Sequence, residues 1–461
     1  MLFFEWRSTL ILKHRGGIRA CYRNQNGVGG ENLGQKLFVF CIDALCESDV
    51  AYMRTLSNFG WMLREGALVE TVDPVYPSFT YPCHVSIITG LYPDRHGIPH
   101  NEQCRAGVDD VPWYTDRAMV KGKFLTELAE EKGMSSCMIS WPVSGGAHIT
   151  YNLPMIVPYS YTGDNPRIYL DGMATDNLLD AYYWKYGYLL KGQYRSLDRF
   201  TMSVAPDIIR DFGQPDLMFV KMCDLDSVRH DLGVDTPEAK EMLRRHNEEL
   251  GVLLESIRRY GDFENTNFVV LGDHGQTDLK KTMRFNLLLQ RAGFQQVDEA
   301  GRLISFDAYC HSTGISAWIE LRDPADEALR QRVYEFLCSV RDSGEYGIGY
   351  VFTKEEAQRL YRLTGPFDFV IEGDPSISFN NELTGELFSD SRPGDYKTAM
   401  ASHGGLPHFR HKTTLFACGP AVKQGAVLAN ARLVDEAPTM ARMLGLDMAD
   451  VDGRVLEEIL K

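Results

Sequence analysis

Residues 36–43 read KLFVFCID, a short apolar run of β-favouring side chains that ends in an aspartate. Such a run, bounded by a polar turn, is typical of a buried strand. Four later segments share this character: SSCMIS (135–140), DLMFVKMCD (216–224), NFVVLGD (267–273) and TTLFACG (413–419). Helical patterns lie between them, in KFLTELAEEKG (123–133), AKEMLRRHNEELGVLLESIRRYG (239–261) and LVDEAPTMARMLGL (433–446). This alternation predicts an α/β fold with a mainly parallel central sheet and helices on both faces.

Length and composition limit the classes of protein that fit this pattern. A chain of 461 residues with 44% hydrophobic and 24% charged residues is globular. It is long enough for one large α/β domain with insertions, or for two or three ordinary domains. The net charge of −15 argues against a nucleic-acid polymer as partner, because that binding relies on clustered Lys and Arg. A small anionic substrate is still compatible if metal ions or local donors supply positive charge.

Cysteine usage and the start of the chain predict a cytoplasmic protein. The ten cysteines have no regular spacing, and Cys41, Cys223 and Cys418 lie in or beside apolar runs, where a free thiol packs as a small hydrophobe. No stretch approaches the roughly 18 apolar residues of a membrane span, and MLFFEWRSTLILKHRGG lacks the order of a signal peptide. Residues 1–35, basic and then glycine-rich, are expected to be a flexible N-terminal extension or sequence upstream of the true start.

Carboxylates and histidines follow several of the predicted strands. Asp43 ends the first strand, Asp226 comes just after 216–224, and Asp273 and His274 follow VVLG. A single strand-end carboxylate is usually a helix cap or a turn residue. Three strands that end this way, at the edge of the sheet where ligands bind, favour a binding site.

Two further histidines complete the set. Asp226 and His230 are four residues apart in DSVRH, so a helix places both on one face, although such pairs are also common on solvated helices. His403, in ASHGGLPH, is followed by glycines that allow close backbone approach. Three aspartates and three histidines form a mixed nitrogen and oxygen set, which suits two Zn²⁺ or Mn²⁺ ions better than Mg²⁺ or Ca²⁺.

The order of the motifs is more specific than any one of them. The chain carries FVFCID (38–43), TYPCH (80–84) running into SIITGLYPDRHGIPHN (86–101), DSVRH (226–230), LGDHG (271–275) and SHGG (402–405). In this order they resemble the nucleotide pyrophosphatase/phosphodiesterase (type I phosphodiesterase) family of the alkaline phosphatase superfamily. The resemblance implies an alkaline phosphatase-like catalytic domain over residues 36–461, with inserted cap segments at about 145–197 and 278–400.

The resemblance also implies a reaction and the residues that perform it. The reaction is hydrolysis of a phosphodiester or pyrophosphate bond in a nucleotide or related small diester, with two divalent metal ions, zinc first and manganese as the alternative. Thr80 would be the nucleophile that forms a covalent phospho-threonine, and the Asn101 amide would support a phosphate oxygen. The metal ligands would be Asp226, His230 and His403 for one ion, and Asp43, Asp273 and His274, with the Thr80 oxygen beside them, for the other.

Alternative functions share this core. A phosphomonoesterase or phosphonate hydrolase of the same superfamily would need extra positive charge, which Lys121, Lys123 or Lys221 could supply. A sulfatase would carry Cys or Ser in place of Thr80. A non-catalytic binding homologue is the alternative from another class, although every core position is filled.

Residues near these motifs have simpler expected roles. Cys83 stands where the family usually has asparagine, and it is expected to pack at a helix start. His84 is expected to orient that helix through a hydrogen bond. His408 or His411 could replace His403 as the ligand. The tyrosine-rich run 182–188 is expected to pack within the first insertion, which would shape the leaving-group pocket.

Overall fold

An eight-stranded sheet forms the centre of the structure, a computed structural model that describes residues 35–461 apart from 109–110, 157–165, 191–196 and 408–411. The strand order is β19-β2-β18-β6-β1-β5-β3-β4. In the middle, β1 (Lys36–Ile42) pairs in parallel with β5 (Leu217–Met222) on one side and with β6 (Thr266–Gly272) on the other. The parallel pairing continues from β5 to β3 (Ser136–Ile139) and from β3 to β4 (Tyr151–Leu153).

One strand of the sheet runs in the opposite direction. β18 (Thr413–Cys418) is antiparallel to both β6 and β2 (Ala67–Asp73), and β19 (Val427–Arg432) pairs in parallel with β2. The five predicted strands are all present, and the prediction of a mainly parallel α/β sheet is confirmed. The sequence did not reveal β2 and β19, because partly exposed residues interrupt their apolar pattern, or β4, which has only three residues.

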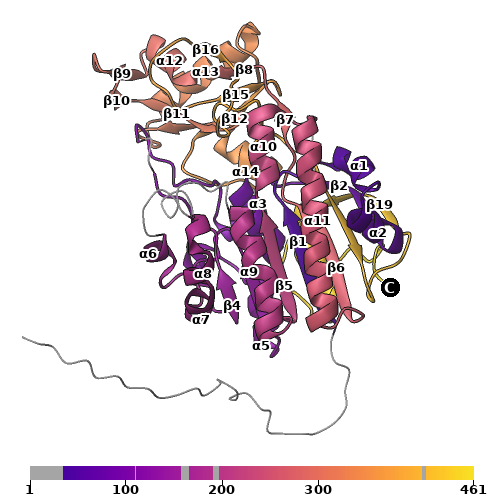
Figure 1. Cartoon of the computed structure of the whole chain (residues 1–461). Coiled ribbons are helices and arrows are strands. Elements are labelled where there is room, and N and C mark those ends of the chain that lie inside the picture. The colour runs from indigo at the N-terminus through magenta and orange to yellow at the C-terminus, as the bar shows by residue number, and fades with distance from the viewer. Residues whose placement is uncertain (1–34, 109–110, 157–165, 191–196, 408–411) are drawn as a thin grey trace, which may run out of the picture. The chain divides into compact units, whose positions relative to one another are not determined.

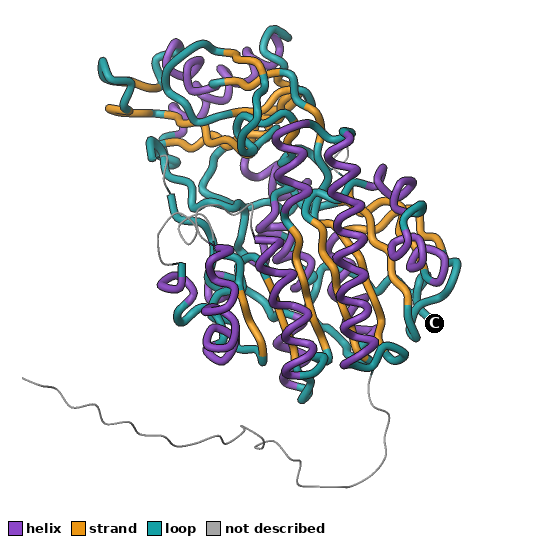
Figure 2. The backbone as a smooth tube through the Cα atoms, in the orientation of Figure 1, coloured by secondary structure: helices purple, strands orange, loops and turns teal. Residues whose placement is uncertain are grey.

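Helices cover both faces of this sheet (Figures 1 and 2). α9 (Leu197–Phe212), α11 (Pro237–Tyr260) and α2 (Ser57–Glu65) pack on one face, and α3 (Thr80–Thr89), α5 (Leu125–Glu131) and α15 (Glu436–Met443) pack on the other. The three predicted helices correspond to α5, α11 and α15. The longest, α11, begins where the sequence signals it, because Thr236 caps the Ala239 amide and Pro237 is the first helical residue.

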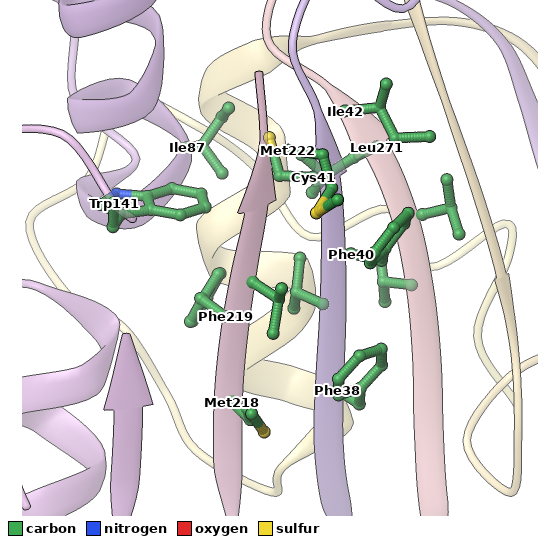
Figure 3. Close-up of a cluster of buried hydrophobic side chains, with 14 of the residues drawn as sticks. Phe38, Phe40, Cys41, Ile42, Ile87, Trp141, Met218, Phe219, Met222 and Leu271 are labelled. Carbon is green, nitrogen blue, oxygen red and sulfur yellow. The ribbon is translucent and has the colours of Figure 1, made fainter. Parts of the chain in front are cut away.

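The core lies on both sides of β1 and β5 (Figure 3). Phe40 and Phe219 are completely buried, as are Ile87 of α3 and Trp141. Trp141 contacts Phe219 edge to face, with ring centroids 4.9 Å apart. Burial of each such side chain contributes about 1.5–3 kcal/mol. The strands that lead to the predicted site are therefore held firmly in the molecule.

A second group of sheets lies above the carboxyl ends of these strands (Figure 1). β11 (Ala308–Thr313), β12 (Ser316–Leu321), β14 (Phe369–Gly373) and β13 (Ile348–Thr353) form an antiparallel sheet that packs with α12 (Phe285–Arg291), α13 (Glu327–Ser343) and α14 (Lys354–Tyr361). Beside it are the three-stranded sheet of β15 (Ile377–Phe379), β8 (Lys281–Met283) and β16 (Phe388–Asp390) and the hairpin of β9 (Gln295–Val297) and β10 (Leu303–Phe306). The bounds of the two insertions stay predictions, and residues 1–34 lie outside the described part of the chain.

The tyrosine-rich run 182–188 lies in short helical segments. It spans the end of η4 (Leu179–Tyr183), α8 (Trp184–Tyr186) and the start of η5 (Gly187–Leu190). Tyr182 and Tyr183 are buried in the main core, whereas Trp184 is 80% exposed. Packing is therefore the role of the buried half of the run. Among the helices that the structure describes, none has the length and apolar composition needed to cross a bilayer.

Candidate metal centre

The register of the central sheet places two aspartates side by side. Ile42 pairs with Gly272 in the β1–β6 ladder, so the residues that follow, Asp43 and Asp273, leave the sheet at the same edge. Ala44 then takes the left-handed conformation, with φ of 59°, which costs a residue other than glycine about 1–2 kcal/mol. Its N–H donates to Asp273 Oδ1 at 3.0 Å. This turn fixes the two carboxylates next to each other.

His274 completes a first buried group with these aspartates. Its Nε2 lies 3.2 Å from Asp273 Oδ2 and 3.5 Å from Asp43 Oδ1. Both carboxylate oxygens are buried and have no hydrogen-bond partner. Buried polar atoms are normally paired, because leaving them without a partner is costly. The ligand atoms of the three residues lie within 4.8 Å of one another, as the donors of one cation site do.

A second group lies beside the first. α10 (Asp224–Leu232) follows β5 and carries Asp226 and His230 on one face, and His403 comes directly after β17 (Ala401–Ser402). Asp226 Oδ1 lies 3.3 Å from His230 Nε2 and 3.8 Å from His403 Nε2. The His403 ring stacks on His274 with centroids 3.9 Å apart, so the two groups adjoin. The structure thus brings together all six predicted ligand residues, while His408 and His411 lie outside the described residues.

The hydrogen bonds of the three histidines show which ring nitrogen faces each group. The Nδ1–H of His230 donates to the Ala401 carbonyl at 2.7 Å, and that of His403 donates to the Ser78 carbonyl at 2.8 Å. His274 Nδ1 lies 3.2 Å from the Gly275 carbonyl. With Nδ1 protonated in this way, each neutral ring presents an Nε2 lone pair to the carboxylates. This arrangement, together with the unpartnered carboxylate oxygens, fits divalent cations.

Burial and charge shift the pKa values within the two groups. Burial, reinforced by the Asp43 charge, raises the pKa of Asp273 well above the usual value of an aspartate. Burial, reinforced by the neighbouring His274, lowers the pKa of His403 well below the usual value. Burial opposes protonation of His230 as well, but the Asp226 charge outweighs it and raises the pKa of His230 to about 9. A metal ion at the second group therefore competes with a proton on His230.

Among the residues that the structure describes, Lys221 of β5 is the one lysine or arginine paired with the first group. It is completely buried, and its Nζ donates to Asp43 Oδ2 at 2.6 Å. This bond leaves Asp43 Oδ1 as the free oxygen that points to His274. In the phosphomonoesterase alternative, Lys221 is one of three lysines that could supply charge for a monoester substrate. Its bond to Asp43 engages that charge, so the structure does not favour that role.

Thr80 is the first residue of α3, where the helix meets the two groups. Phe79 precedes it in extended conformation, and the Thr80 side chain is only 7% exposed. Its Oγ1 lies 3.3 Å from His274 Nε2. The first-turn amides of a helix lack intrahelical partners, and the helix dipole favours negative charge there. The hydroxyl therefore lies where an anionic group is stabilised.

The neighbours of Thr80 on α3 have the roles predicted for them. His84 is buried, and its Nδ1 lies 2.7 Å from the Thr80 carbonyl, so the ring braces the first turn of the helix. Cys83 is buried in the main hydrophobic core, as expected for a packing role. Burial also raises the pKa of its thiol well above the usual value, so the thiol is unreactive.

A cleft of about 310 Å³ opens over the two groups. Thr80 and Asn101 both line it, and Asn101 Oδ1 accepts a hydrogen bond from the Tyr81 amide at 2.9 Å. Because the oxygen is used in this way, the NH₂ of Asn101 is left for the cleft. Tyr81, Trp113 and Met155 add an apolar wall. The sequence singled out Thr80 and Asn101 but gave no signal for Trp113, which lies in a loop without a motif.

The charged residues of the cleft wall were also missed. Lys397 Nζ lies 3.0 Å from Glu102 Oε1, and both residues line the cleft together with Asp395. Glu102 directly follows the motif that ends at Asn101, which is the only sequence signal for it. Lys121 and Lys123 are not among the described residues that line the cleft, and Lys123 is paired with Glu131 on the surface.

The chain is similar to known proteins over most of its length. A family model described as type I phosphodiesterase / nucleotide pyrophosphatase matches residues 37–395. Ectonucleotide pyrophosphatase/phosphodiesterase family member 7 of Homo sapiens is 23% identical over 389 residues, which cover 77% of this chain and 70% of that protein. The bis(5′-adenosyl)-triphosphatase ENPP4 of Homo sapiens is 26% identical over 246 residues, or 50% of this chain and 45% of that protein.

Solved structures share the fold. Murine ectonucleotide pyrophosphatase/phosphodiesterase 5 matches with a TM-score of 0.65 at 17% identity, over 93% of this chain and 100% of that one. A second structure of the murine protein, an inactive threonine-to-alanine variant in complex with AMP, matches equally well. The family model spans far more than half of the sequence. The chain is therefore a hydrolase of the type I phosphodiesterase/nucleotide pyrophosphatase family.

Proposed function

We propose that the chain hydrolyses phosphodiester or pyrophosphate bonds of small nucleotide-like substrates, with two divalent metal ions and Thr80 as the nucleophile. The arrangement of lone pairs around Thr80 carries this proposal. Two buried carboxylate oxygens without partners and three imidazole Nε2 atoms lie in two adjoining groups, and the Thr80 hydroxyl lies 3.3 Å from His274 Nε2. A donor set of this kind fits cations that neutralise a phosphate group and activate a hydroxyl.

The two groups of ligands would each hold one ion. Asp226, His230 and His403 would hold the first, and Asp43, Asp273 and His274, with Thr80 Oγ1 beside them, would hold the second. The mixed nitrogen and oxygen donors favour Zn²⁺, with Mn²⁺ as the alternative. When bound, the ions would lower the pKa of the hydroxyl and stabilise charge on the phosphate.

The reaction that we propose has two displacements at phosphorus. In the first, Thr80 Oγ1 forms a bond to phosphorus, the bond to the leaving oxygen breaks, the hydroxyl proton passes to solvent, and the leaving oxygen takes a proton if it needs one. In the second, a water oxygen attacks phosphorus, the bond to Oγ1 breaks, and Thr80 regains its proton. The products are a phosphate monoester and the leaving group. Thr80 is unchanged at the end of the cycle.

Asn101 and α3 would support the charge that develops during both steps. With its oxygen held by the Tyr81 amide, Asn101 can direct its NH₂ to a non-bridging phosphate oxygen. The amide of Thr80 and the dipole of α3 act on the same side of the phosphate. The murine relative supports the importance of the nucleophile, because its threonine-to-alanine variant is inactive and holds AMP.

The charge of the cleft favours diesters over monoesters. Among the described residues that line the cleft, Lys397 is the only lysine or arginine, and Glu102 neutralises it. Asp395 adds a negative charge to the wall. A monoester carries more negative charge than a diester, so it would need a cation that this wall does not offer. The phosphomonoesterase or phosphonate hydrolase alternative therefore ranks second, and a binding-only role ranks third.

A cytoplasmic location also stays a proposal. Its support is the state of the cysteines, because all nine in the described part of the chain are free and seven of them are buried. Proteins of oxidising compartments more often pair their cysteines. Fractionation of cells that express the tagged full-length chain tests this location, and recovery from the medium or from a membrane fraction would contradict it.

Turnover of three p-nitrophenyl substrates tests the proposed reaction. Zinc-loaded protein is expected to hydrolyse bis(p-nitrophenyl) phosphate and p-nitrophenyl thymidine 5′-monophosphate faster than p-nitrophenyl phosphate. EDTA treatment and the Thr80→Ala substitution should each abolish turnover, while Thr80→Ala should still bind zinc by mass spectrometry of the metal content. A faster monoester reaction would favour the second-ranked function. Full activity of Thr80→Ala would exclude Thr80 as the nucleophile.

A further inference from the structure

Thr80 and His403 reach the candidate metal centre without direct support from the central sheet. The segment 74–79 separates Thr80 from the end of β2, and His403 follows β17, which is not a strand of that sheet. The two segments instead hold each other at Ser78. Its carbonyl accepts the Nδ1–H of His403 at 2.8 Å, and its Oγ accepts the Gly404 amide at 2.9 Å. A shift of either segment would therefore move both side chains.

The second group of sheets lies directly against the His403 segment. The turn between β11 and β12 approaches it backbone to backbone, because the Ile315 amide donates to the His403 carbonyl at 3.0 Å. Gly314 of this turn has a φ of 74°, and a Cβ at this position would lie 2.1 Å from the same carbonyl oxygen, so only glycine fits. Ser316 Oγ donates to the Gly404 carbonyl at 2.7 Å. The support that the central sheet does not give to His403 comes from this second group.

Glu372 joins this support to the segment that carries Thr80. It lies on β14 and is only 4% exposed. Its Oε1 accepts the Leu406 amide at 2.8 Å, and its Oε2 accepts the Tyr76 hydroxyl at 2.9 Å. Leu406 belongs to the His403 segment, and Tyr76 belongs to the segment before α3. One buried carboxyl therefore contacts both segments at once.

The surroundings of Glu372 hold the carboxyl in place. Tyr76 and Leu406 are buried with Trp318 in a small hydrophobic cluster of their own. Ser316 is the partner of Glu372 in the β12–β14 ladder, so both side chains project from the same face of the sheet toward the same loop. Burial of a carboxyl costs free energy unless its oxygens are hydrogen-bonded. Both oxygens of Glu372 are bonded, and their partners are the two segments that lead to the site.

We propose that Glu372 is a positioning residue for the candidate metal centre. It fixes His403 and Thr80 relative to each other, because it holds the segments of both from the side of the second group of sheets. Loss of this contact would let His403 Nε2 move away from Asp226, while the ligands of the first group stay tied to their strands. The inference rests on the proposed function, because it concerns zinc binding and hydrolysis at the same site.

Four variants of the full-length chain test this role. Glu372→Leu removes both acceptors, whereas Glu372→Gln keeps an oxygen for the Leu406 amide and offers its NH₂ to the Tyr76 oxygen. Burial raises the pKa of Glu372 to about 8, so the neutral glutamine resembles the carboxyl at neutral pH. Tyr76→Phe keeps the buried ring and removes the hydroxyl. Asp368→Leu is the matched control, since Asp368 is equally buried just before β14, and its carboxylate is bonded to β12 and α13.

Zinc titration of the EDTA-treated protein is the first measurement. The native chain is expected to bind two ions, and the step that is lost in Asp226→Asn identifies the ion at the second group. Glu372→Leu should weaken that ion about 10- to 100-fold, the usual cost of losing a contact that orients a ligand, and leave the other ion within about twofold. Glu372→Gln should restore most of the affinity. Tyr76→Phe should lose about fivefold, as expected for one hydrogen bond.

Hydrolysis of bis(p-nitrophenyl) phosphate at saturating zinc is the second measurement. Glu372→Leu should lower kcat about 100-fold, the effect of a nucleophile displaced by about 1 Å. KM should change little, because the walls of the cleft are intact. Asp368→Leu should lower the Tm, as the loss of a paired buried carboxylate does, yet keep both zinc affinities and kcat. A role in stability alone would make the two leucine variants alike.

The outcomes separate this inference from the proposed function. If the native protein binds two zinc ions but cleaves no diester, the proposed function fails, and the zinc titrations still decide the role of Glu372. If it binds no zinc, both fail. Equal weakening of the two ions in Glu372→Leu, no weakening of either, or the same losses in Asp368→Leu would refute the positioning role. If Glu372→Leu does not fold, Tyr76→Phe decides, and an unchanged zinc affinity in that variant refutes the inference.

Discussion

Replacing Asp273 by asparagine is expected to stabilise the metal-free protein while it removes a metal ligand. In the native chain, Asp273 Oδ2 is buried without a hydrogen-bond partner, and it lies near the buried Asp43 carboxylate. Asparagine keeps the shape and the Oδ1 acceptor that holds the Ala44 and His274 amides. Its NH₂ would also face the His274 Nε2 lone pair, now 3.2 Å from Oδ2. The native carboxyl, whose pKa burial raises well above the usual value, has to take up a proton to make this bond, whereas the asparagine amide makes it directly.

The size of the gain follows from the cost of an unsatisfied buried group. That cost is about 1–3 kcal/mol, and more for a charge, so the free energy of unfolding of metal-free Asp273→Asn should rise by about that amount. For a chain of 461 residues this corresponds to an increase in Tm of roughly 1–3 °C. Zinc binding should instead stabilise the native chain more than the variant, because the Asp273 carboxylate is one of the proposed ligands. At 100 times its Kd it stabilises each intact site by about 2.7 kcal/mol, so the variant should lose about half of the zinc-induced increase.

Thermal unfolding of EDTA-treated protein, with and without added zinc, measures both effects. Asp368→Asn is the matched control, because Asp368 is equally buried but fully paired, with Leu321 N–H at 2.9 Å and Arg330 Nη2 at 2.9 Å. This control should lower the Tm of the metal-free protein and keep the whole zinc-induced increase.

An Asp273→Asn variant that melts below the native protein without metal would refute the reasoning from the unpartnered carboxylate. Retention of the full zinc effect in that variant would remove Asp273 from the ligand set. The two refutations are independent, because one concerns the metal-free protein and the other the metal-bound protein.

Two further predictions concern the phosphate contact and the pH dependence of stability. Asn101→Ala should lower kcat/KM by about 100- to 1,000-fold without changing the zinc content; an equal loss of bound zinc would show that the residue acts on the metal centre instead. Glu372 of β14 is buried, which raises its pKa to about 8. Because this folded value exceeds the unfolded one, the neutral carboxyl stabilises the fold fully below pH about 4.5, and that contribution is lost as pH rises toward 8. The free energy of unfolding should therefore fall by up to about 1.4 kcal/mol per pH unit in this range. Urea unfolding at pH 6 and pH 8 measures the slope, which Glu372→Gln should flatten; an unchanged slope in the variant would assign the effect to another group.

The proximity of the candidate ligand residues could be predicted from the sequence because most of them are tied to the ends of regular elements. Asp43 and Asp273 each follow a strand whose apolar run is continuous, and strands of this kind come together in a parallel sheet. Asp226 and His230 share a helix face whose period is fixed. Sequence spacing therefore implies their proximity in space.

His403 could not be placed by spacing alone. It follows a two-residue strand, β17, far along the chain, and tertiary contacts hold it, above all the bond from its Nδ1–H to the Ser78 carbonyl. His403 became a candidate ligand because of the order of the motifs along the chain, since its local sequence pattern does not indicate that role. Lys221 shows a different limit, because one of the three lysines that could have supplied charge for a monoester substrate is bound to Asp43 inside the sheet. A sequence shows that a charge is present but not which partner holds it.

The residues of the cleft walls, which we expect to select the substrate, could not be predicted from the ends of regular elements or from the order of the motifs. Trp113, Asp395, Lys397 and Arg392 reach the cleft, or the adjoining cavity that shares Asp395 and Lys397 with it, from irregular segments, and no periodicity connects them with Thr80. Relatives that share the six ligands can therefore differ in every wall residue without any change in the reaction at phosphorus. It follows that the substrate of this chain has to be inferred from the loop between β16 and His403, which lines both cavities, and not from the candidate metal centre.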